Sequence, residues 1–151
     1  MRRKDREIPD RTSIDQIIRR CRVCRLALSD DGQPYVVPLN FGYDGYRLYL
    51  HSSLAGKKME IIRRNNRVGF EFDILHKITE AELDCDWGAR YESVVGSGIA
   101  EIVESHQEKA SGLGWILRQY GGGPGEFTER DLDSIAVIRI SIRSISGKAR
   151  K

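Results

Sequence analysis

The chain has 151 residues, of which 40% are hydrophobic, with three cysteines and a formal net charge of +3. Acids and bases are interspersed, which argues against a nucleic-acid partner, because such proteins carry a clustered basic face. No apolar run approaches the ~18 residues of a membrane span, and no signal peptide is visible. We therefore expect a cytoplasmic protein with reduced thiols and no membrane partner. It should form one domain over 1–151, in which 1–10 make a flexible or extended arm.

The first predicted helix begins near Ser13. Ser13 and Gln16 have the spacing of a capping box. Apolar residues then recur at helical spacing from Ile14 to Cys21, which predicts a single apolar stripe. We expect a short helix that packs against one end of a sheet.

Two strands follow, joined by a turn. Residues 22–29 alternate as a strand, and residues 30–34 are dense in turn formers. Residues 35–41 alternate again and form the second strand. Pro38 lies inside it, and because proline removes a ladder donor, we expect an edge or a bulge there.

A second hairpin is predicted by the Asp-Gly pair at 44–45, after which residues 46–51 return as a strand. A helix over 55–64 comes next, and Ser52 and Ser53 are its candidate caps.

Two cations occupy the first turn of that helix. Lys57 and Lys58 lie at its amino end, where the helix dipole is positive and lysine is unfavourable. A solvated face is the ordinary explanation for paired lysines. An anion bound at the same end is the functional one.

The middle of the chain reads as two strands around an irregular connection. Residues 68–74 alternate as a half-buried strand. Residues 77–89 are polar, and we expect a loop or bulged connection in which an exposed Trp87 marks a contact surface. Residues 91–103 form a long strand whose internal glycines indicate a bulge or a close approach of another group.

The last third is predicted to contain a helix, a loop and a strand. Residues 107–120 form an amphipathic helix, and the glycine-rich residues 121–125 form a loop. The last strand has its apolar face at 136–142, and residues 146–151 are expected as a basic tail. Because hairpins join most strands, we predict a mainly β, antiparallel, six- to seven-stranded barrel, partly closed, with peripheral helices.

The chemical motifs are few. Cys21 and Cys24 have metal-ligand spacing, but no second pair completes a zinc site, so core packing is favoured and no metal site is predicted. The chain lacks the glycine motifs of dinucleotide-binding and P-loop proteins. His51 ends a strand just before the serines and lysines. It is either a polar rim residue or a group that donates a hydrogen bond or proton to a ligand.

Six segments of the chain form a recognisable series. They read RVCRLAL at 22–28, YVVPLNFGY at 35–43, LYLHSS at 48–53, GKK at 56–58, NRVGFE at 66–71 and YESVVGSGIAE at 91–101. Their order and spacing resemble the flavin-binding split-barrel proteins related to pyridoxamine 5′-phosphate oxidase. Within that family the chain is similar to the nitroimidazole-reductase-like branch.

The resemblance implies an FMN-binding split barrel with FMN held between two subunits of a homodimer. It implies that His51 lies near the flavin and the substrate as the catalytic residue, and that the Trp87 segment reaches toward the partner subunit. The cofactor-binding residues that it implies are Val37, Pro38, Leu39 and Asn40 along the isoalloxazine ring, Ser52, Lys57 and Lys58 at the phosphate, and Ser93, Val94 and Val95 beside the flavin.

The function implied is that of an FMN-dependent oxidoreductase. It would take hydride from a reduced nicotinamide donor and reduce a small organic acceptor, for example a nitroaromatic compound. Residues 144–151 lack the substrate-binding signature of true pyridoxamine phosphate oxidases, which argues against vitamin B6 oxidation. Two alternatives stay open: a non-catalytic flavin or haem binding module on the same fold, and a nucleic-acid-associated protein that uses the basic segment 2–25.

Overall fold

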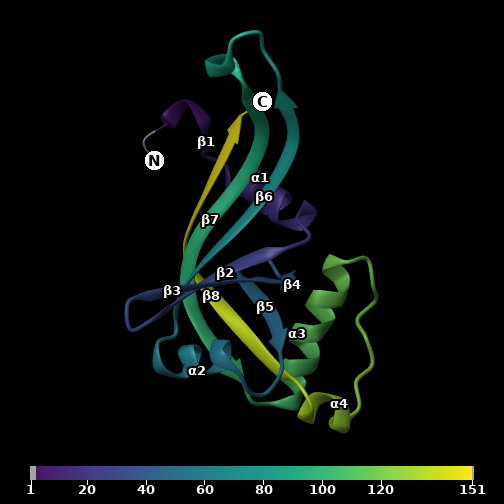
Figure 1. Cartoon of the computed structure of the whole chain (residues 1–151). Coiled ribbons are helices and arrows are strands. Elements are labelled where there is room, and N and C mark those ends of the chain that lie inside the picture. Colours follow the sequence, from purple (N-terminus) through teal and green to yellow (C-terminus); the bar gives the residue numbers. More distant parts are fainter. Residues whose placement is uncertain (1–2, 151) are drawn as a thin grey trace.

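The computed structural model describes residues 3–150, so the predictions for Met1, Arg2 and Lys151 lie outside the described residues. The strands are β1 Glu7–Ile8, β2 Cys24–Asp30, β3 Gln33–Leu39, β4 Phe41–Tyr43, β5 Arg47–Ser52, β6 Arg67–Thr79, β7 Gly88–Val103 and β8 Ala136–Arg150. The helices are α1 Arg11–Arg20, α2 Lys57–Arg64, α3 His106–Gln119 and α4 Glu129–Asp133, with 3₁₀ turns at Lys4–Arg6 and Asp84–Asp86 (Figure 1).

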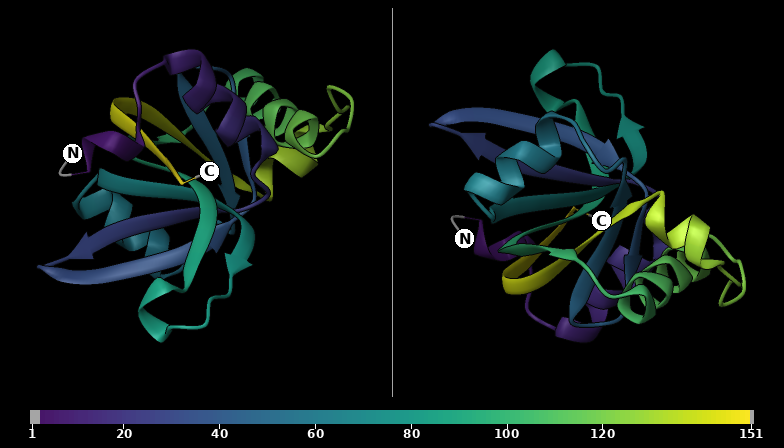
Figure 2. Two further views of the ribbon diagram at one scale, coloured as in Figure 1. Left: turned by 90° about the horizontal axis from the view of Figure 1, so that it is seen from above. Right: turned by 90° about the horizontal axis from the view of Figure 1, so that it is seen from below.

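The strands of the described chain form one antiparallel sheet in the order β3-β2-β6-β7-β8-β5-β4, and β1 pairs with β8 beside this path. The long strands β7 and β8 form its spine and curve strongly, so that the sheet wraps around a core (Figure 2). The prediction of a mainly β, antiparallel split-barrel fold with peripheral helices is confirmed. The structure has eight strands rather than six or seven, partly because one predicted strand is divided.

That division falls at Asn40, where the sequence predicted a single strand over 35–41. In the structure β3 ends at Leu39 and β4 begins at Phe41, and the two strands lie at opposite ends of the strand order. The alternation of side chains continues unbroken through Asn40, which is why the sequence shows no boundary there. The chain therefore passes from one edge of the wrapped sheet to the other through a single residue.

The core lies on the inner face of the wrapped sheet. Val68, Phe70 and Phe72 alternate into it from β6, as predicted, and all three are buried. The ring centroids of Phe72 and Phe41 are 4.7 Å apart, which joins β6 to β4 across the core. Apolar burial from these strands is the main source of stability.

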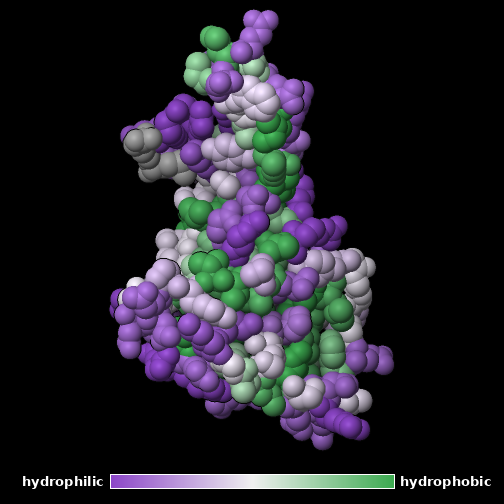
Figure 3. Space-filling view, in the orientation of Figure 1, coloured by the Kyte–Doolittle hydropathy of each residue, from purple (hydrophilic) through white to green (hydrophobic). Residues whose placement is uncertain are grey.

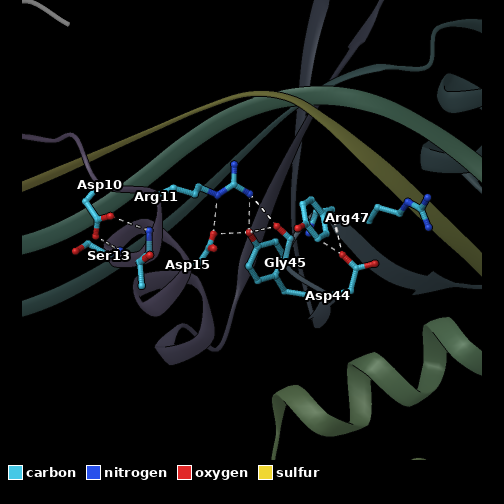
Figure 4. A network of polar contacts seen from close by, with 10 residues as sticks. Asp10, Arg11, Ser13, Asp15, Asp44, Gly45 and Arg47 are labelled. Carbon is cyan, nitrogen blue, oxygen red and sulfur yellow. Dashed lines mark hydrogen bonds and ion pairs between the residues drawn. The ribbon is translucent and has the colours of Figure 1, made fainter.

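Helix α1 begins earlier than predicted, because Asp10 and not Ser13 is its N-cap. The Asp10 carboxylate accepts hydrogen bonds from the backbone amides of Thr12 and Ser13 (Figure 4). Its bonds from these amides and from the Ser13 side chain hold the pKa of Asp10 below its ordinary value. Just before this cap, β1 pairs with the end of β8, so the described part of the expected arm is attached to the sheet.

A polar network then fastens α1 to the turn between β4 and β5. The Arg11 guanidinium donates to the Tyr43 hydroxyl at 2.8 Å and to the Gly45 carbonyl at 2.9 Å, and Asp15 Oδ1 lies 2.6 Å from the same hydroxyl (Figure 4). The carboxylate of Asp44 accepts from the amides that follow the turn, and Gly45 has φ +103°, as the predicted Asp-Gly turn requires.

Helix α3 lies directly against β4. A Cβ atom on Gly42 would come within 2.4 Å of the backbone at Trp115 and Ile116, so only glycine allows this approach. The helical periodicity of 107–120 predicts a buried stripe through Ala110, Leu113, Leu117 and Tyr120, but in the structure Ile116 is buried and Leu117 is 39% exposed. The buried Lys109 ammonium donates to the carbonyls of Leu132 and Ile135, and thereby ties α3 to the α4 region.

Two segments predicted as irregular contain strand. Residues 80–87 are the expected loop, with a 3₁₀ turn, but β6 continues to Thr79 and β7 begins at Gly88, so the two strands of a protruding hairpin extend into the segment 77–89. The expected basic tail is the end of β8, which pairs with β7 as far as Arg150. Both segments are polar because one face is exposed, and this hides their strand character. The expected bulge in β7 is present, between Ser97 and Gly98.

Candidate functional site

The carboxyl ends of β3 and β5 meet at Asn40. Phe41 pairs with Leu50 in the antiparallel β4–β5 ladder. Continuing this register by one position sets Asn40 opposite His51. Leu39, Asn40, His51 and Ser52 are therefore brought together, although the sequence predicted them on two separate strands.

Alternation decides which of the predicted side chains face outward. Val37 and Leu39 pack against the core, and Val94 is fully buried. Val37 and Leu39 are only partly buried and lie on the edge strand β3, whereas the backbone of Val94 is paired with both β6 and β8. Pro38 and Asn40 are exposed, and Val95 is 49% exposed, so their side chains lie on the outer face of the sheet.

A row of cross-strand pairs connects the predicted residues of β3 and β7. Pro38 pairs with Arg25, Arg25 with Glu71, Glu71 with Val95, and Val95 with Ser146. Directly paired residues point to the same face, so the row defines one outer surface across five strands. β3 is an edge strand of the order, as Pro38 predicted.

Arg25 is the second member of this row, next to Pro38, and the sequence did not predict it as a site residue. Its guanidinium donates to Glu71 at 2.9 Å and also to Asp73, and these hydrogen bonds raise the pKa of Arg25. The guanidinium thus links β2 and β6 beside Pro38. The alternation of residues 22–29, which sets Arg25 opposite the buried Cys24 and Leu26, was the available signal.

The amino end of α2 is uncapped, and its predicted serine caps are wrong. The helix begins at Lys57, with Gly56 as N-cap at φ 117° and no side-chain hydrogen bond to the first turn. Ser53 Oγ instead donates to the carbonyl of Ala55 at 2.7 Å. The first-turn amides are consequently free of any side-chain acceptor within the described chain, which is the condition for an anion site.

Lys57 and Lys58 stand in this first turn, as predicted. The Lys57 ammonium lies 5.0 Å from the centre of the Tyr35 ring, which places α2 beside the interior side of β3. Partial burial lowers the pKa of Lys58. Neither lysine forms an ion pair with an acid of residues 3–150. Glu60, the acid of the same first turn, pairs with neither, so two cations at the positive end of a helix have no ion-pair partner within the described chain.

His51 differs from the other two histidines. Nε2 of His76 is 2.9 Å from Glu92, and Nε2 of His106 is 2.8 Å from Asp133. His51 is exposed at the end of β5, is held in place by pairing with Val137, and has no ring hydrogen bond within residues 3–150. Its imidazole is free to contact a ligand on the outer surface.

Cys21 and Cys24 form neither a metal site nor a reactive thiol site. Cys21 and Cys24 are buried, and burial raises the pKa of the Cys21 thiol to about 11 and that of Cys24 further still. Both thiols are thus protonated at neutral pH. Within the described residues no group of three metal-ligating side chains is arranged to hold a metal ion. No helix of the same part of the chain is long and apolar enough to cross a membrane.

The predicted site residues Pro38, Asn40, His51 and Val95 are exposed on the surface of one chain. A hollow of about 520 Å³ lies elsewhere, under the amino-terminal segment between Asp5 and Asp10 and beside Arg150. A planar ligand lying on this surface would remain half exposed in a single chain.

Comparison with known proteins identifies the family of this chain. A family model described as pyridoxamine 5′-phosphate oxidase matches residues 10–149. An uncharacterised protein of Rhizobium meliloti strain 1021 is 39% identical over 49 residues. That match spans 32% of this chain and 32% of the relative, so the chain covers about a third of that curated protein.

Several solved structures share the fold. A protein from Bacteroides thetaiotaomicron assigned to 5-nitroimidazole antibiotic resistance has a TM-score of 0.85 and 34% identity, with 94% of this chain and 85% of that chain covered. An FAD-binding protein from Mesorhizobium loti has a TM-score of 0.73 and 28% identity, with coverages of 97% and 98%. A flavocytochrome from Azotobacter vinelandii has a TM-score of 0.84 at 23% identity, covering 100% and 72%, and at that identity shows the fold alone.

Proposed function

The chain belongs to the pyridoxamine 5′-phosphate oxidase family, and from this premise we propose that it is an FMN-dependent oxidoreductase that reduces a small organic acceptor. A nitroaromatic compound is the acceptor that the relative from Bacteroides thetaiotaomicron suggests. A reduced nicotinamide is the proposed donor. Bound flavin would supply the transfer of hydride or electrons, and the chain supplies binding, orientation and electrostatics.

The observation that carries this proposal is the uncapped amino end of α2. Lys57 and Lys58 stand there without ion-pair partners in the described chain, next to first-turn amides that have no side-chain acceptor. A phosphate monoester satisfies both features, since it is a dianion with several acceptor oxygens. Ser52 adds a hydroxyl at the end of β5, close to the same turn. FMN ends in such a phosphate, which favours FMN over a flavin without one.

The proposed surface for the flavin ring lies on the outer face of the sheet. Val37 and Leu39 are partly buried on the edge strand β3 and can offer backbone groups at its edge, whereas the backbone of Val94 is paired with both β6 and β8. Pro38 and Val95 present apolar atoms on the outer face in one cross-strand row. The ion pair of Arg25 and Glu71 lies between these two apolar residues, so the proposed ring surface is mixed in polarity.

His51 is the proposed catalytic residue. Its ring is exposed beside Asn40, and no described side chain holds its nitrogens. The imidazole can therefore donate a hydrogen bond or a proton to an acceptor lying on the flavin.

A second subunit completes the proposed site. The site residues form an open surface, and a second copy of the chain related by a two-fold axis is the simplest cover for it. We propose a homodimer with two flavins at the interface. The same unpartnered His51 is also a suitable axial ligand for haem, so a non-catalytic flavin or haem module is the second candidate.

The absorbance spectrum of the purified protein separates these candidates. Bands of oxidised flavin, and release of FMN rather than FAD on denaturation, support the proposal. A Soret band indicates haem. A colourless protein that gains no flavin bands after incubation with FMN would contradict both the oxidoreductase and the binding-module candidates.

Turnover is tested with a reduced nicotinamide and a nitroaromatic or quinone acceptor. We expect His51→Ala to lower kcat while flavin binding is retained. His106→Ala is the matched control, because that ring is paired with Asp133 away from the site.

A further inference from the structure

A groove between α1 and α3 shares no residue with the proposed flavin surface. It has a volume of about 230 Å³ and is lined by Arg19 of α1, Tyr43 of β4, and Trp115, Arg118 and Gln119 of α3. Figure 2 shows the two helices side by side. On the side of the molecule where α3 lies, hydrophilic residues adjoin hydrophobic ones (Figure 3). The groove thus combines charged and aromatic side chains.

Aromatic rings orient the two arginines of the groove. The Arg19 guanidinium lies 5.5 Å from the centre of the Tyr43 ring, and the Arg118 guanidinium lies 4.9 Å from that of Trp115. A guanidinium that lies over a ring keeps the N–H groups at its edge available to an acceptor. Both arginines are exposed, so these donors are open to a ligand.

The charge of these arginines is not balanced by the groove. Arg19 and Arg118 form no ion pair and no side-chain hydrogen bond with residues 3–150, and no acid lines the groove. Asp15, which does lie close to the Tyr43 hydroxyl, is paired with Arg11 at 2.7 Å. Two like charges that line one hollow repel each other. A bound anion would remove this repulsion.

The helix ends do not account for the two arginines either. Cations are common at helix carboxyl ends, because they can bond the last carbonyls. Here other donors occupy that role. The Gln119 side-chain amide lies 3.1 Å from the carbonyls of Ile18, Arg19 and Cys21, and the Arg22 guanidinium donates to the carbonyl of Gln119 at 3.2 Å. The guanidinium groups in the groove are therefore left for another acceptor.

The groove is formed before any ligand binds. The contacts of Gln119 join the end of α3 to the end of α1. The Tyr120 hydroxyl donates to the carbonyl of Arg22 at 2.7 Å and accepts from the amide of Phe41 at 3.2 Å, which joins the same end of α3 to β4. A ligand meets groups that are already ordered, which lowers the entropy cost of binding.

The charge and size of the groove indicate the class of ligand. Two guanidinium groups without a counter-charge suit a dianion, and their planar forks match the paired oxygens of a phosphoryl group. The groove, at about 230 Å³, is smaller than the ~300–1,000 Å³ of a site for a drug-sized ligand. The ligand that fits is a small phosphate ester.

A nucleic-acid strand fits this surface less well. Such a strand is held by a basic groove that follows its backbone over several nucleotides. The neighbouring arginines of the described chain are already paired, Arg20 with Glu92 and Arg25 with Glu71. The unpaired charge is confined to the groove, which favours a single phosphate group.

We propose that the groove between α1 and α3 binds a small phosphate ester, with its phosphoryl group held between Arg19 and Arg118. Tyr43 and Trp115 orient the two guanidinium groups, and Gln119 fixes the distance between the helices. Nucleotides and sugar phosphates share the group that is recognised. This site is separate from the proposed phosphate site at α2 and does not depend on the flavin.

Isothermal titration calorimetry of the full chain tests the site. The parent protein carries Lys57→Ala and Lys58→Ala, so that the proposed phosphate cations of α2 do not contribute. ADP and ribose 5-phosphate should each bind once per chain, and adenosine should not bind. The ratio of the two affinities then distinguishes a nucleotide from a sugar phosphate as the better ligand.

Removing the two guanidinium groups should abolish most of this binding. Arg19→Gln with Arg118→Gln should weaken ADP binding at least about 100-fold, because hydrogen bonds to charged groups are lost on both sides of the phosphate. Arg67→Gln with Arg130→Gln is the matched control, since these exposed arginines lie on β6 and α4, and it should bind ADP like the parent. Circular dichroism confirms that each variant is folded.

Three calorimetric outcomes would overturn the inference. They are a parent that binds neither phosphate ester, adenosine that binds as tightly as ADP, and an Arg19→Gln, Arg118→Gln variant that binds ADP as tightly as the parent. An oligothymidylate strand that binds more tightly than ADP, with a steep loss of affinity on added salt, would also overturn it and assign the surface to nucleic acid.

Tryptophan emission locates the bound ligand. With Trp87→Phe in the same parent, Trp115 is the remaining tryptophan, and its emission should change with the midpoint found by calorimetry. Unchanged emission at saturating ADP would place the binding elsewhere and contradict the inference. Because no measurement uses flavin, a natural chain that fails to bind FMN would remove the proposed function and leave this test intact.

Discussion

The two faces of the β6–β7 ladder differ in burial, even where their residues are of the same type. Val94 and Val95 are adjacent and identical, yet Val94 is fully buried in the core and Val95 is 49% exposed on the proposed flavin surface. Position along the strand, and not residue type, decides which valine stabilises the fold and which one meets a ligand. The inner face holds the barrel together, and the outer face is available for function.

The largest effect should come from the inner face. Phe72→Ala removes a fully buried ring that contacts Phe41 and Phe70, and it should lower the free energy of unfolding by about 3–5 kcal/mol. Urea denaturation measures the change. Val36→Ala is the outer-face control, because Val36 is 56% exposed and should change stability little. Equal losses of unfolding free energy in the two variants would contradict the proposed difference between the inner and outer faces.

The second effect should appear in ligand affinity rather than stability. Lys57→Ala with Lys58→Ala removes both proposed phosphate cations, and FMN should bind about 100-fold more weakly, since hydrogen bonds to charged groups contribute ~1.5–3 kcal/mol each. The apoprotein should become slightly more stable, because cations are unfavourable at a helix amino end. Flavin fluorescence titration and thermal unfolding measure the two changes. An unchanged affinity for FMN would show that α2 is not part of the flavin site.

A smaller effect should depend on pH. Burial, followed by the bond to Asp15, raises the pKa of Tyr43 to about 12 from 10.0, and burial raises the pKa of Cys21 to about 11 from 9.0. As pH rises through 9 to 12, the unfolded chain loses these protons first, so the folded state binds more protons and the free energy of unfolding falls. Denaturant midpoints across this range check the sign. Tyr43→Phe should flatten the decline, and an unaltered slope would contradict the assignment.

The smallest predicted effect comes from comparing the two adjacent valines, Val94 and Val95. Val95→Ala should change stability by less than ~0.5 kcal/mol, as exposed substitutions usually do. Val94→Ala removes the same atoms from the core and should cost about 1.5 kcal/mol or more. Thermal unfolding of the two variants at low protein concentration, where any dimer is dissociated, measures the difference.

The parts of the fold that follow from alternation could be predicted. The half-buried strand over residues 68–74 and the turn at the Asp-Gly pair 44–45 were predicted correctly, because both depend on local chemistry. The boundary at Asn40 could not be predicted, since alternation does not reveal which strand becomes the neighbour. The strands in 77–79 and 146–150 were hidden for a related reason, because their exposed faces carry the polar residues of a loop.

The candidate site was predictable in its residue types more than in its arrangement. The lysines at the start of α2 were conspicuous because they oppose the helix dipole. Arg25 could not be recognised as a site residue, since its partners Glu71 and Asp73 are more than forty residues away in the sequence. Whether a residue such as Leu39 offers its side chain or its backbone depends on the curvature of the sheet, which no local pattern contains.

The position of β8 has a consequence for how the chain is made. β8 is the last strand of the described residues, yet it pairs with β1, β5 and β7, and the β4–β5 hairpin joins the sheet only through it. On the ribosome, that hairpin must wait with its apolar face unpaired until residues 136–150 have emerged. The barrel therefore cannot close before its last strand is available. A chain that stops before β8 would expose Leu48 and Leu50 to chaperones and proteases instead of forming a smaller barrel.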